Sequence, residues 1–324
     1  MRYVNESDIR ALGVDWTRTV DAVERAAHCL VTGDFAQPIK PYLRYREMEN
    51  RIIAMPAFLG GDVNIAGIKW IASFPRNIDR GIPRAHSTVI LNEAETGRPV
   101  AIVNTALLSV VRTASVTGIV LRSYVRARNP QRVQLGIAGW GPIGRYHLEM
   151  ARAVLGRRLS SVRIFDIRPT VRTIAPDIDM AGIDVSFVSS WQEAYDEADV
   201  FITCTVSPAP YIDRRPKAGS LQLNISLRDY CVSFHEFVKG AIVVDDWDEV
   251  CRERTDIEMM YLECGLRREG TTSIGDFVTS DYWQTISDDA PVMFNPMGMA
   301  VFDLAIGAEY VALAEQRGVG TLLD

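Results

Sequence analysis

The first strong hydrophobic pattern in the chain covers residues 15–32 and has the period of an α-helix. Its apolar side chains recur every three or four residues: Val20, Val23, Ala27, Leu30 and Val31. This spacing places them on one face of a helix. Gly33 follows directly, where a glycine in the left-handed conformation ends many helices. Residues 15–32 are therefore predicted to form an amphipathic helix.

The pattern between residues 40 and 105 is that of β-strands. Short apolar runs follow one another here: KPYLRYR (40–46), NRIIAMPAF (50–58), VNIAGIKWIASF (63–74) and STVILNEAETGRPVAIVNT (87–105). The last run holds two apolar stretches around NEAETGRP, which is rich in turn formers, and is predicted to be a β-hairpin. Antiparallel sheet is the simplest arrangement for this region.

The rest of the chain alternates helical patterns with short, nearly continuous apolar runs. Residues 106–125 are predicted to form a long, largely buried helix. The runs that follow are VQLGIAG (133–139), VRIFD (162–166), IDVSFV (183–188), DVFITCTV (199–206), LQLNIS (221–226) and AIVVDD (241–246). Such runs are typical of parallel strands buried on both faces. Residues 298–318 are again an apolar helix, which must pack on an earlier part of the chain.

Three glycines in GIAGWGPIGRYHLE (136–149) have the spacing of a dinucleotide-binding turn. The spacing alone is a weak signal, but a strand precedes the turn, a helix follows it, and an acidic residue ends the next strand. The residues expected to contact the cofactor here are Gly139, Gly141, Pro142, Ile143, Gly144 and Asp166. An ordinary strand-to-helix turn is the alternative.

The acidic residue also bears on the choice of cofactor. Asp166 would accept hydrogen bonds from the ribose hydroxyls and repel a 2'-phosphate, which favours NAD over NADP. Arg168 is either a solvated loop charge or a residue that could meet such a phosphate.

Composition excludes several classes of function. The net charge is −6 and the basic residues are scattered, so we expect no nucleic-acid partner. The five cysteines contain no C-x-x-C pair and the four histidines lie far apart, so neither a disulfide framework nor a metal site is expected. No apolar stretch reaches the length of a membrane span. We expect a soluble, cytoplasmic protein.

Several basic residues lie among apolar neighbours, where burial is costly unless they meet an anion. Lys69 in AGIKWIASF is the clearest; its alternative is the solvent face of an edge strand. Arg112 in VVRTAS is similar, with a structural salt bridge as the alternative. Arg44 and Arg46 alternate in YLRYR and would share one face of a strand, where one could bind a carboxylate or both could be solvated.

Two aspartates are further candidates. Asp229 follows the run LQLNIS, at the carboxyl end of a strand, where ligand crevices of α/β sheets open. It could be a general acid or base, or alternatively a helix cap or turn residue. Asp303 in GMAVFDLA is either a buried site residue or an exposed helix position.

Taken together, these motifs resemble the ornithine cyclodeaminase and mu-crystallin family over essentially the whole chain. The resemblance rests on IKW near 69, VVRTAS near 112, GWGPIG, Asp166, and Asn224 with Asp229. The segments KPYLR, RIIAMP, GIKWI, VVDDW and NPMGMA resemble the 2,3-diaminopropionate-forming branch. Enzymes of that branch use NAD to cleave N-(2-amino-2-carboxyethyl)-L-glutamate oxidatively in siderophore and antibiotic pathways.

The resemblance implies an α/β fold in two parts. Residues 116–297 would be an inserted Rossmann domain that binds NAD. Residues 1–115 with 298–324 would be a discontinuous α+β domain that binds substrate and pairs with a second subunit. The protein would then be a homodimer.

The resemblance also implies roles for single residues. The substrate, an amino-acid conjugate, would be bound by Arg44, Lys69, Arg112 and Asp303. Asp229 and Lys69 would be catalytic, with cationic neighbours keeping Asp229 ionised. Ser87, Thr205 and Asn224 would contact the cofactor.

One departure from the family concerns the substrate. Ornithine cyclodeaminases usually have glycines before the aspartate and a lysine shortly after it, whereas this chain reads SLRDYCVSFHE. This difference favours the diaminopropionate-forming branch. The alternatives are a cyclodeaminase that converts ornithine to proline and ammonia, another amino-acid oxidoreductase or imine reductase of the family, and a mu-crystallin-like dinucleotide-binding protein.

Overall fold

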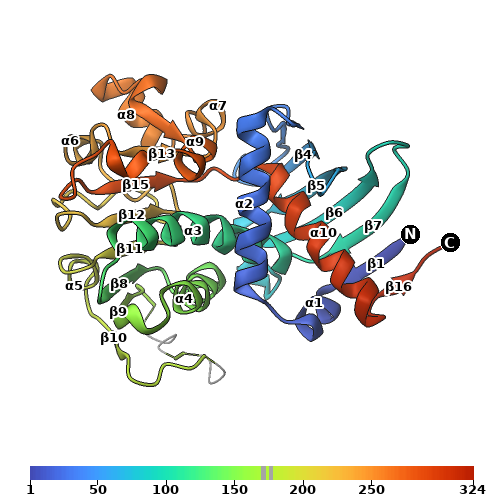
Figure 1. Ribbon diagram of the computed structural model, residues 1–324, viewed down its shortest axis with the longest axis horizontal. Helices are drawn as coiled ribbons and strands as arrows, with labels where there is room; N and C mark the ends of the chain where they lie inside the picture. The colour runs from blue at the N-terminus through green and yellow to red at the C-terminus, as the bar shows by residue number, and fades with distance from the viewer. Residues whose placement is uncertain (169–172, 175–177) are drawn as a thin grey trace. The chain divides into compact units, whose positions relative to one another are not determined.

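The computed structural model describes residues 1–168, 173–174 and 178–324, which form two compact units (Figure 1). The first unit consists of residues 1–115 and 298–324, and the second of residues 116–297. Helix α3 (Leu107–Arg128) contains the boundary between them. The roles expected for these parts of the chain stay predictions.

The first unit combines one sheet with a few helices. Its elements are β1 (Arg2–Asn5), α1 (Glu6–Leu12), α2 (Trp16–Thr32), β2 (Phe35–Ala36), β3 (Tyr42–Leu43), β4 (Arg51–Leu59), β5 (Ile65–Ser73), η1 (Pro75–Arg80), β6 (Ala85–Glu93), β7 (Pro99–Asn104), the start of α3, α10 (Ala300–Arg317) and β16 (Thr321–Leu322).

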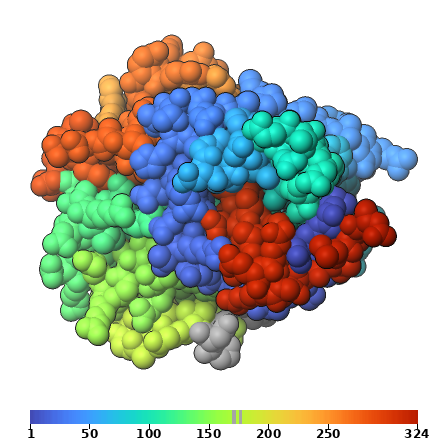
Figure 2. All heavy atoms as spheres, turned by 45° about the vertical axis from the view of Figure 1, so that its right-hand side comes forward, coloured from blue at the N-terminus to red at the C-terminus, as the bar shows by residue number. Residues whose placement is uncertain are grey.

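The sheet of this unit brings the two ends of the described chain together. Its strand order is β16-β1-β7-β6-β5-β4-β2, with β3 beside β4. Strands β4 to β7 are antiparallel, whereas β1 runs parallel to β7. Helix α10 packs on β4, β5 and β6 and against α2. Figure 2 shows β1 in dark blue beside the red C-terminal segment, as their pairing requires.

Local sequence signals explain the elements that were predicted here. Helix α2 begins after Asp15, whose side chain accepts a hydrogen bond from the amide of Arg18, and ends at Gly33 with φ of +73°. Both are standard helix caps. The predicted hairpin is formed by β6 and β7, with Gly97 in the turn at φ of +72°. The helix and hairpin predictions are confirmed.

One strand prediction in this unit is wrong. The run KPYLRYR forms strand only at Tyr42 and Leu43, and Arg46 has φ of +57°. The backbone therefore leaves the extended conformation before Arg46, so Arg44 and Arg46 do not alternate along one strand face. The short elements β1, α1 and β16 were not predicted, because two to seven residues carry too little periodicity.

The second unit is an α/β structure. Its elements are the rest of α3, β8 (Val133–Ala138), α4 (Pro142–Leu155), η2 (Gly156–Arg158), β9 (Leu159–Phe165), β10 (Asp184–Phe187), α5 (Trp191–Tyr195), β11 (Val200–Thr203), β12 (Leu221–Asn224), η3 (Val232–Phe234), α6 (His235–Val238), β13 (Ile242–Val244), α7 (Trp247–Val250), α8 (Asp256–Cys264), η4 (Arg268–Gly270), β14 (Thr271–Ser273), α9 (Ile274–Thr279), η5 (Tyr282–Gln284) and β15 (Val292–Asn295).

The strands of the second unit pair in parallel in the order β10-β9-β8-β11-β12-β15-β13-β14. The direction of strand addition reverses between β8 and β11, which is the switch point where doubly wound sheets bind ligands. Gly136 of β8 faces α5 and Ile137 faces α4, so these helices cover opposite faces. The predicted α/β class with a Rossmann domain is confirmed.

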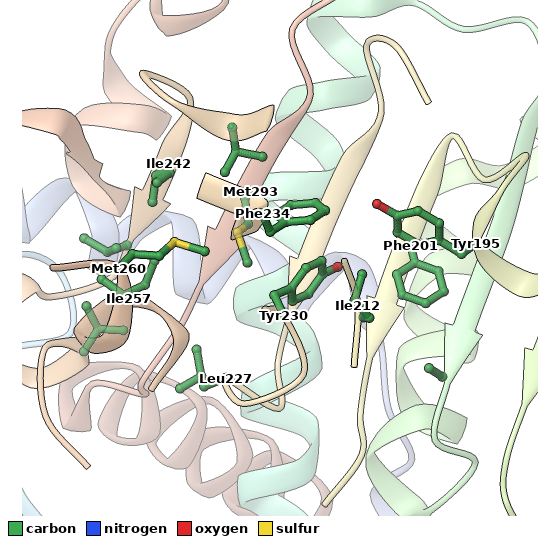
Figure 3. Packing of buried hydrophobic residues seen from close by; sticks show 14 of the residues in the cluster. Tyr195, Phe201, Ile212, Leu227, Tyr230, Phe234, Ile242, Ile257, Met260 and Met293 are labelled. Carbon is green, nitrogen blue, oxygen red and sulfur yellow. The ribbon is translucent and has the colours of Figure 1, made fainter. Parts of the chain in front are cut away.

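Aromatic and aliphatic side chains form the core of this unit (Figure 3). The rings of Tyr230 and Phe234 pack edge to face, 4.6 Å apart, and those of Tyr195 and Phe201 are 4.9 Å apart. Strand β15, which lies inside the sheet, was not predicted because its four residues stand between two prolines. Among the described helices, none combines the length and apolar content needed to cross a bilayer.

Candidate active site

The glycine turn after β8 has the shape that a pyrophosphate requires. Gly139 has φ of +94°, and a Cβ there would lie 2.5 Å from the carbonyl oxygen of Cys204. A Cβ on Gly144 would lie 2.1 Å from the carbonyl oxygen of Gly139. A Cβ on Gly141 would meet nothing within 4 Å, so the space beside this residue is open. Pro142 begins α4, whose first amides have no intrahelical partner.

Asp166 closes the other side of this turn. Its carboxylate accepts a hydrogen bond from the amide of Trp140 at 2.7 Å and is paired with Arg168, whose Nε and Nη2 donate at 3.0 Å. Burial by itself would raise the pKa of Asp166, but the bonds from Arg168 and Trp140 lower it overall. The Asp166 carboxylate is therefore an anion, and Arg168 is its ion-pair partner, with a side chain that is 57% exposed.

These features fit a dinucleotide. Open space beside Gly141, amides at the start of α4 and an ionised carboxylate after β9 are what a pyrophosphate and a ribose need. The side chain of Trp140 is fully buried and donates from Nε1 to the carbonyl of Thr173 at 3.0 Å. The bulky residue in the turn thus anchors the loop.

Asp229 lies in the loop that follows β12 and is fully buried. Hydroxyl groups surround its carboxylate: Oγ1 of Thr205 at 2.6 Å and 2.8 Å from its two oxygens, Oγ of Ser226 at 2.6 Å, and the phenol of Tyr211 at 3.4 Å. We call these three side chains the hydroxyl cradle. Because their residues are partly exposed, they can pass protons between the carboxylate and its surroundings.

The electrostatics of Asp229 differ from the expectation. Burial raises the pKa of its carboxyl, and hydrogen bonds from Ser226, Thr205 and Tyr211 offset only part of that effect. The one cation that contributes, Arg228, lowers the pKa less than any of these bonds. The expectation that cationic neighbours keep Asp229 ionised is therefore wrong. A raised pKa makes the Asp229 carboxylate a stronger proton acceptor than a solvated aspartate, which suits an acid/base group.

Two residues expected to contact the cofactor also hold this loop. Thr205 bonds Asp229, as described above. Asn224 uses its whole amide within the protein: Nδ2 donates to Asp256 and Asn295, and Oδ1 accepts from Thr203 and from the amide of Leu227. The side-chain amide of Asn224 therefore has no hydrogen-bonding position left for a nucleotide, and contact of this residue with the cofactor stays a prediction.

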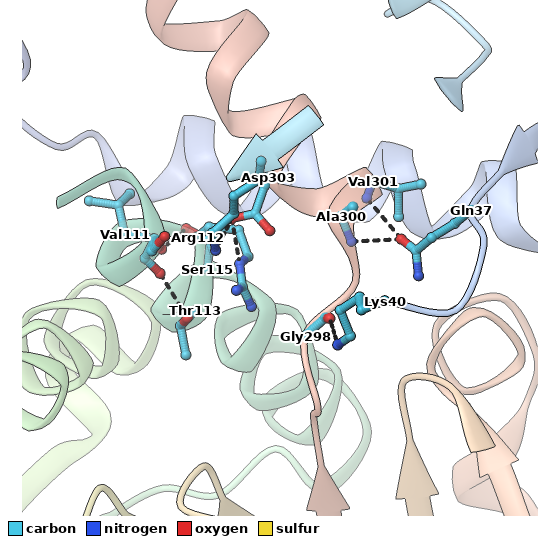
Figure 4. A network of polar contacts seen from close by, with 12 residues as sticks. Gln37, Lys40, Val111, Arg112, Thr113, Ser115, Gly298, Ala300, Val301 and Asp303 are labelled. Carbon is cyan, nitrogen blue, oxygen red and sulfur yellow. Dashed lines mark hydrogen bonds and ion pairs between the residues drawn. The ribbon is translucent and has the colours of Figure 1, made fainter. Parts of the chain in front are cut away.

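In the first unit, Figure 4 shows Arg112 bonded to Asp303 of α10 and Lys40 bonded to Gly298. Nζ of Lys69 on β5 and Nε of Arg112 on α3 lie 2.8 Å and 3.0 Å from the same oxygen of Asp303. Lys40 donates to the carbonyl oxygen of Gly298 at 2.7 Å. We call Lys40, Lys69, Arg112 and Asp303 the cation cluster. All four are buried, and the two basic groups of Lys69 and Arg112 share the one carboxylate of Asp303.

The charges within the cation cluster are coupled. Burial lowers the pKa of Lys69 to about 8, with Asp303 opposing this and Arg112 and Lys40 adding to it. Burial would raise the pKa of Asp303, but Arg112 and Lys69 lower it overall. At neutral pH the cluster therefore keeps a net positive charge, which favours an anionic ligand.

The guanidinium of Arg112 has room because of a glycine. A Cβ on Gly298 would lie 3.0 Å and 3.2 Å from the two Nη atoms of Arg112. In the described part of the chain, those Nη atoms have no hydrogen-bond partner, because Asp303 bonds only Nε. They are the cluster's free donors, and a carboxylate matches their spacing.

Of the remaining predicted residues, Asp303 belongs to the cation cluster, whereas Arg44 and Ser87 have no described bond to it. Asp303 is fully buried and holds the two cations, so it orients the cluster. Arg44 follows β3 and stacks on the ring of Tyr42, 5.0 Å from its centroid. Ser87 on β6 is buried, and its hydroxyl lacks a hydrogen-bond partner among the described residues.

With this geometry described, comparison with known proteins gives the family. The sequence matches the model of the ornithine cyclodeaminase/mu-crystallin family over residues 11–312. The chain belongs to this family. It is 34% identical to N-((2S)-2-amino-2-carboxyethyl)-L-glutamate dehydrogenase from Staphylococcus aureus, over all of this chain and 98% of that protein. It is 26% identical to alanine dehydrogenase from Archaeoglobus fulgidus, over 98% of this chain and 96% of that one.

Solved structures of similar proteins show that the ornithine cyclodeaminase/mu-crystallin fold extends over the whole chain. Δ1-Pyrroline-2-carboxylate reductase from Thermococcus litoralis, in complex with NADH and L-proline, has a TM-score of 0.87 at 22% identity and full coverage of both chains. An archaeal alanine dehydrogenase dimer with bound NAD has a TM-score of 0.86 at 24% identity, covering 100% of this chain and 99% of the other. The resemblance to the family is confirmed.

One member of the cation cluster, Lys40, was not predicted from the sequence. Lys40 lies in QPIKPYLR, where no apolar run suggests burial. It is only 3% exposed because the segment before α10 covers it. Gln37, three residues earlier, accepts hydrogen bonds from the amides of Ala300 and Val301 and so fixes the start of α10. A lysine between two prolines, close to a polar capping residue, was the available signal.

Proposed function

We propose that this protein is an NAD-dependent dehydrogenase that converts N-(2-amino-2-carboxyethyl)-L-glutamate into 2-oxoglutarate and L-2,3-diaminopropionate. The observation that carries the proposal is the cation cluster, whose surplus of positive charge suits a ligand with several carboxylates. The Staphylococcus aureus relative bears the name of this activity at 34% identity. Diaminopropionate made in this way would serve siderophore or antibiotic synthesis.

The residues of this chain divide the work. Lys69 and the free Nη atoms of Arg112 bind substrate carboxylates, with Asp303 fixing both side chains. Arg44 is a further candidate for a carboxylate, and the unpaired hydroxyl of Ser87 for a polar group of substrate or cofactor. Lys69 and Arg112 are preorganised for the substrate, because Asp303 fixes their positions before it binds, and this reduces the entropy lost on binding.

The glycine turn and Asp166 hold the cofactor. When bound, NAD⁺ accepts a hydride from the glutamate-side Cα of the substrate, which becomes an imine that water hydrolyses. Asp229 accepts the proton of the secondary amine and later that of the attacking water, and passes each through the hydroxyl cradle. NAD is favoured over NADP because Asp166 is ionised and already neutralises Arg168.

Product analysis tests the proposal directly. The protein is incubated with NAD⁺ and the candidate conjugate, and products are identified by mass spectrometry while NADH is followed by absorbance. We expect 2-oxoglutarate, diaminopropionate and NADH in equal amounts. Ornithine conversion to proline without net NADH would instead make the protein a cyclodeaminase. Nucleotide binding without product from any amino acid would favour a mu-crystallin-like binding protein.

A further inference from the structure

Asp256 is a buried carboxylate for which the proposed reaction has no use. It is 3% exposed and is the first residue of α8, whose N-cap is Thr255. Its Oδ2 accepts three N–H groups: Nδ2 of Asn224 at 2.9 Å, and the amides of Asp229 and Tyr230, both at 3.2 Å. All three donors come from the end of β12 and the loop after it. Because Thr255 already caps α8, these bonds serve the loop.

The main chain of Asp256 fixes a second point of the same loop. Its amide donates to the carbonyl oxygen of Leu227 at 2.8 Å, while the amide of Leu227 donates to Oδ1 of Asn224 at 3.0 Å. Leu227 has φ of +63°, a left-handed conformation that is rare for leucine. Such a conformation persists only where its surroundings impose it. Asp256 and Asn224 supply that constraint.

The catalytic candidate of this loop, Asp229, lies within the stretch from Leu227 to Tyr230 that Asp256 holds. The amide of Asp229 is anchored to Asp256, and its carbonyl oxygen accepts from the amides of Tyr211 and Ile212, both at 2.8 Å. Its carboxylate is bonded by Ser226 of the same loop and by Thr205 and Tyr211 of the segment after β11. Asp256 thus fixes the amide side of Asp229, while the segment after β11 fixes its carbonyl side.

We propose that Asp256 is a positioning residue that holds the backbone of Asp229, so that its carboxylate stays buried within the hydroxyl cradle. The inference rests on the role proposed for Asp229 in the reaction. It extends that role to a residue on another element that touches neither substrate nor cofactor.

The charges around Asp256 agree with such a function. Burial raises its pKa to about 7, hydrogen bonds from Asn224 and the Tyr230 amide oppose the rise, and the carboxylate of Asp229 adds to it. The Tyr211, Tyr230 and Cys231 side chains also interact electrostatically with Asp256. A buried carboxylate beside another one is unfavourable, and its retention here is explained by the three donors it binds.

Three variants of the full-length protein test the proposal. Asp256→Ala removes the acceptor, Asp256→Asn keeps a neutral one, and Glu263→Gln makes the same change from carboxylate to amide at an exposed position of α8. We measure kcat and KM on the conjugate, the NAD dissociation constant, amide hydrogen exchange over residues 225–231, and the Asp229 pKa. That pKa comes from carboxyl ¹³C NMR, assigned with Asp229→Asn.

We expect kcat to fall about 100-fold in Asp256→Ala and about three- to tenfold in Asp256→Asn, because neutral acceptors bind amides less strongly. KM and NAD affinity should change less than twofold, and Glu263→Gln should match the wild type. The Asp229 pKa should fall in both Asp256 variants as its carboxylate reaches water, and exchange over 225–231 should quicken. A role confined to stability would lower the melting temperature and leave the Asp229 pKa in place.

The possible outcomes separate this inference from the proposed function. If Asp256→Ala does not fold, Asp256→Asn decides: wild-type kcat with an unchanged Asp229 pKa overturns the inference. If the wild type does not turn over the conjugate, the proposed function fails. In that case the Asp229 pKa and the exchange rates decide, since neither needs a substrate. Unchanged values in both Asp256 variants would overturn the positioning role, and the expected changes would support it.

Discussion

Lys69 shows how burial can tune a binding residue. Its amino group is almost fully buried, and its pKa is lowered to about 8 although it touches the Asp303 carboxylate. Desolvation of the ammonium outweighs the attraction of one counter-ion that Arg112 also shares. Lys69 is therefore a cation at neutral pH that loses its charge in mildly alkaline solution.

This pKa predicts a pH dependence of ligand binding. As the pH rises through about 8, Lys69 loses its proton and its attraction for a carboxylate. We expect the Kd for 2-oxoglutarate, a product without an amine that could titrate, to increase about 10- to 30-fold between pH 7 and 9.5, the upper value being the limit for one proton. Isothermal titration calorimetry measures it. In Lys69→Arg, which keeps its charge, the dependence should flatten, and an equally steep rise there would assign the titration to another group.

Asp229 predicts a different kinetic signature. Asp229→Asn keeps the size of the side chain but removes its ability to take a proton, so we expect kcat to fall about 100- to 10,000-fold. NAD affinity should stay within about twofold, as measured by fluorescence titration, since the glycine turn is untouched. Asp213→Asn, an exposed change in the same unit, serves as the control. Wild-type turnover by a folded Asp229→Asn protein would remove Asp229 from the mechanism.

The sequence predicted which charged residues are important, but not the residues with which they form ion pairs. Lys69, Arg112 and Asp229 stood out because charged residues among apolar neighbours need an explanation. The ion pair between Lys69 and Asp303 joins residues 234 positions apart, and no local pattern reveals such a pair. The same holds for Lys40, whose burial comes from the segment around Gly298.

The strand-turn-helix element from β8 to α4 shows two separate uses of glycine. Gly144 is needed because a Cβ would meet the backbone of Gly139, whereas the space beside Gly141 is empty. One glycine therefore permits packing within the protein, and the other leaves room for a ligand.

This difference predicts opposite effects on stability. Gly144→Ala forces backbone atoms apart, and we expect it to lower the free energy of unfolding by about 1–3 kcal/mol and to weaken NAD binding. Gly141→Ala should leave the melting temperature unchanged and still weaken NAD binding. Differential scanning fluorimetry and NAD titration of both variants check this. Equal stability losses in the two variants would contradict the assignment.

Elements were predictable from the sequence wherever the hydrophobic period was long. Helices α2, α3 and α10 and the strands of the Rossmann domain that precede β14 all had clear patterns. Strands β14 and β15 have three and four residues, and their place in the sheet depends on pairing with β13. Such segments become strands because of their neighbours, so single-sequence patterns do not mark them.

At the scale of the whole molecule, one apolar face of the sheet in the first unit predicts a protein-protein interface. In the first unit, Pro56, Ile68, Ile90 and Ile102 stand side by side across four strands and are only half-buried. Trp70 on the same face is 45% exposed. A solvated sheet face normally carries polar residues, so an apolar row of this kind marks a protein interface.

We therefore expect the protein to be a homodimer that buries this face. Ile90→Lys places a charge in the middle of the row and should shift the sedimentation coefficient toward that of a monomer. Thr96→Lys, in the exposed turn between β6 and β7, should leave the mass unchanged. A dimer in which Ile90→Lys has no effect would move the interface elsewhere, and a wild-type monomer would exclude the assembly.

The pairing of β1 with β16 also bears on how the chain is made. A ribosome synthesises Lys69 long before Asp303, and β1 long before β16, with which it pairs. During translation, the segment 116–297 is complete while the earlier part still lacks its central helix and its counter-ion. Until α10 is synthesised, residues 1–115 therefore expose apolar surface and a lysine without its counter-ion.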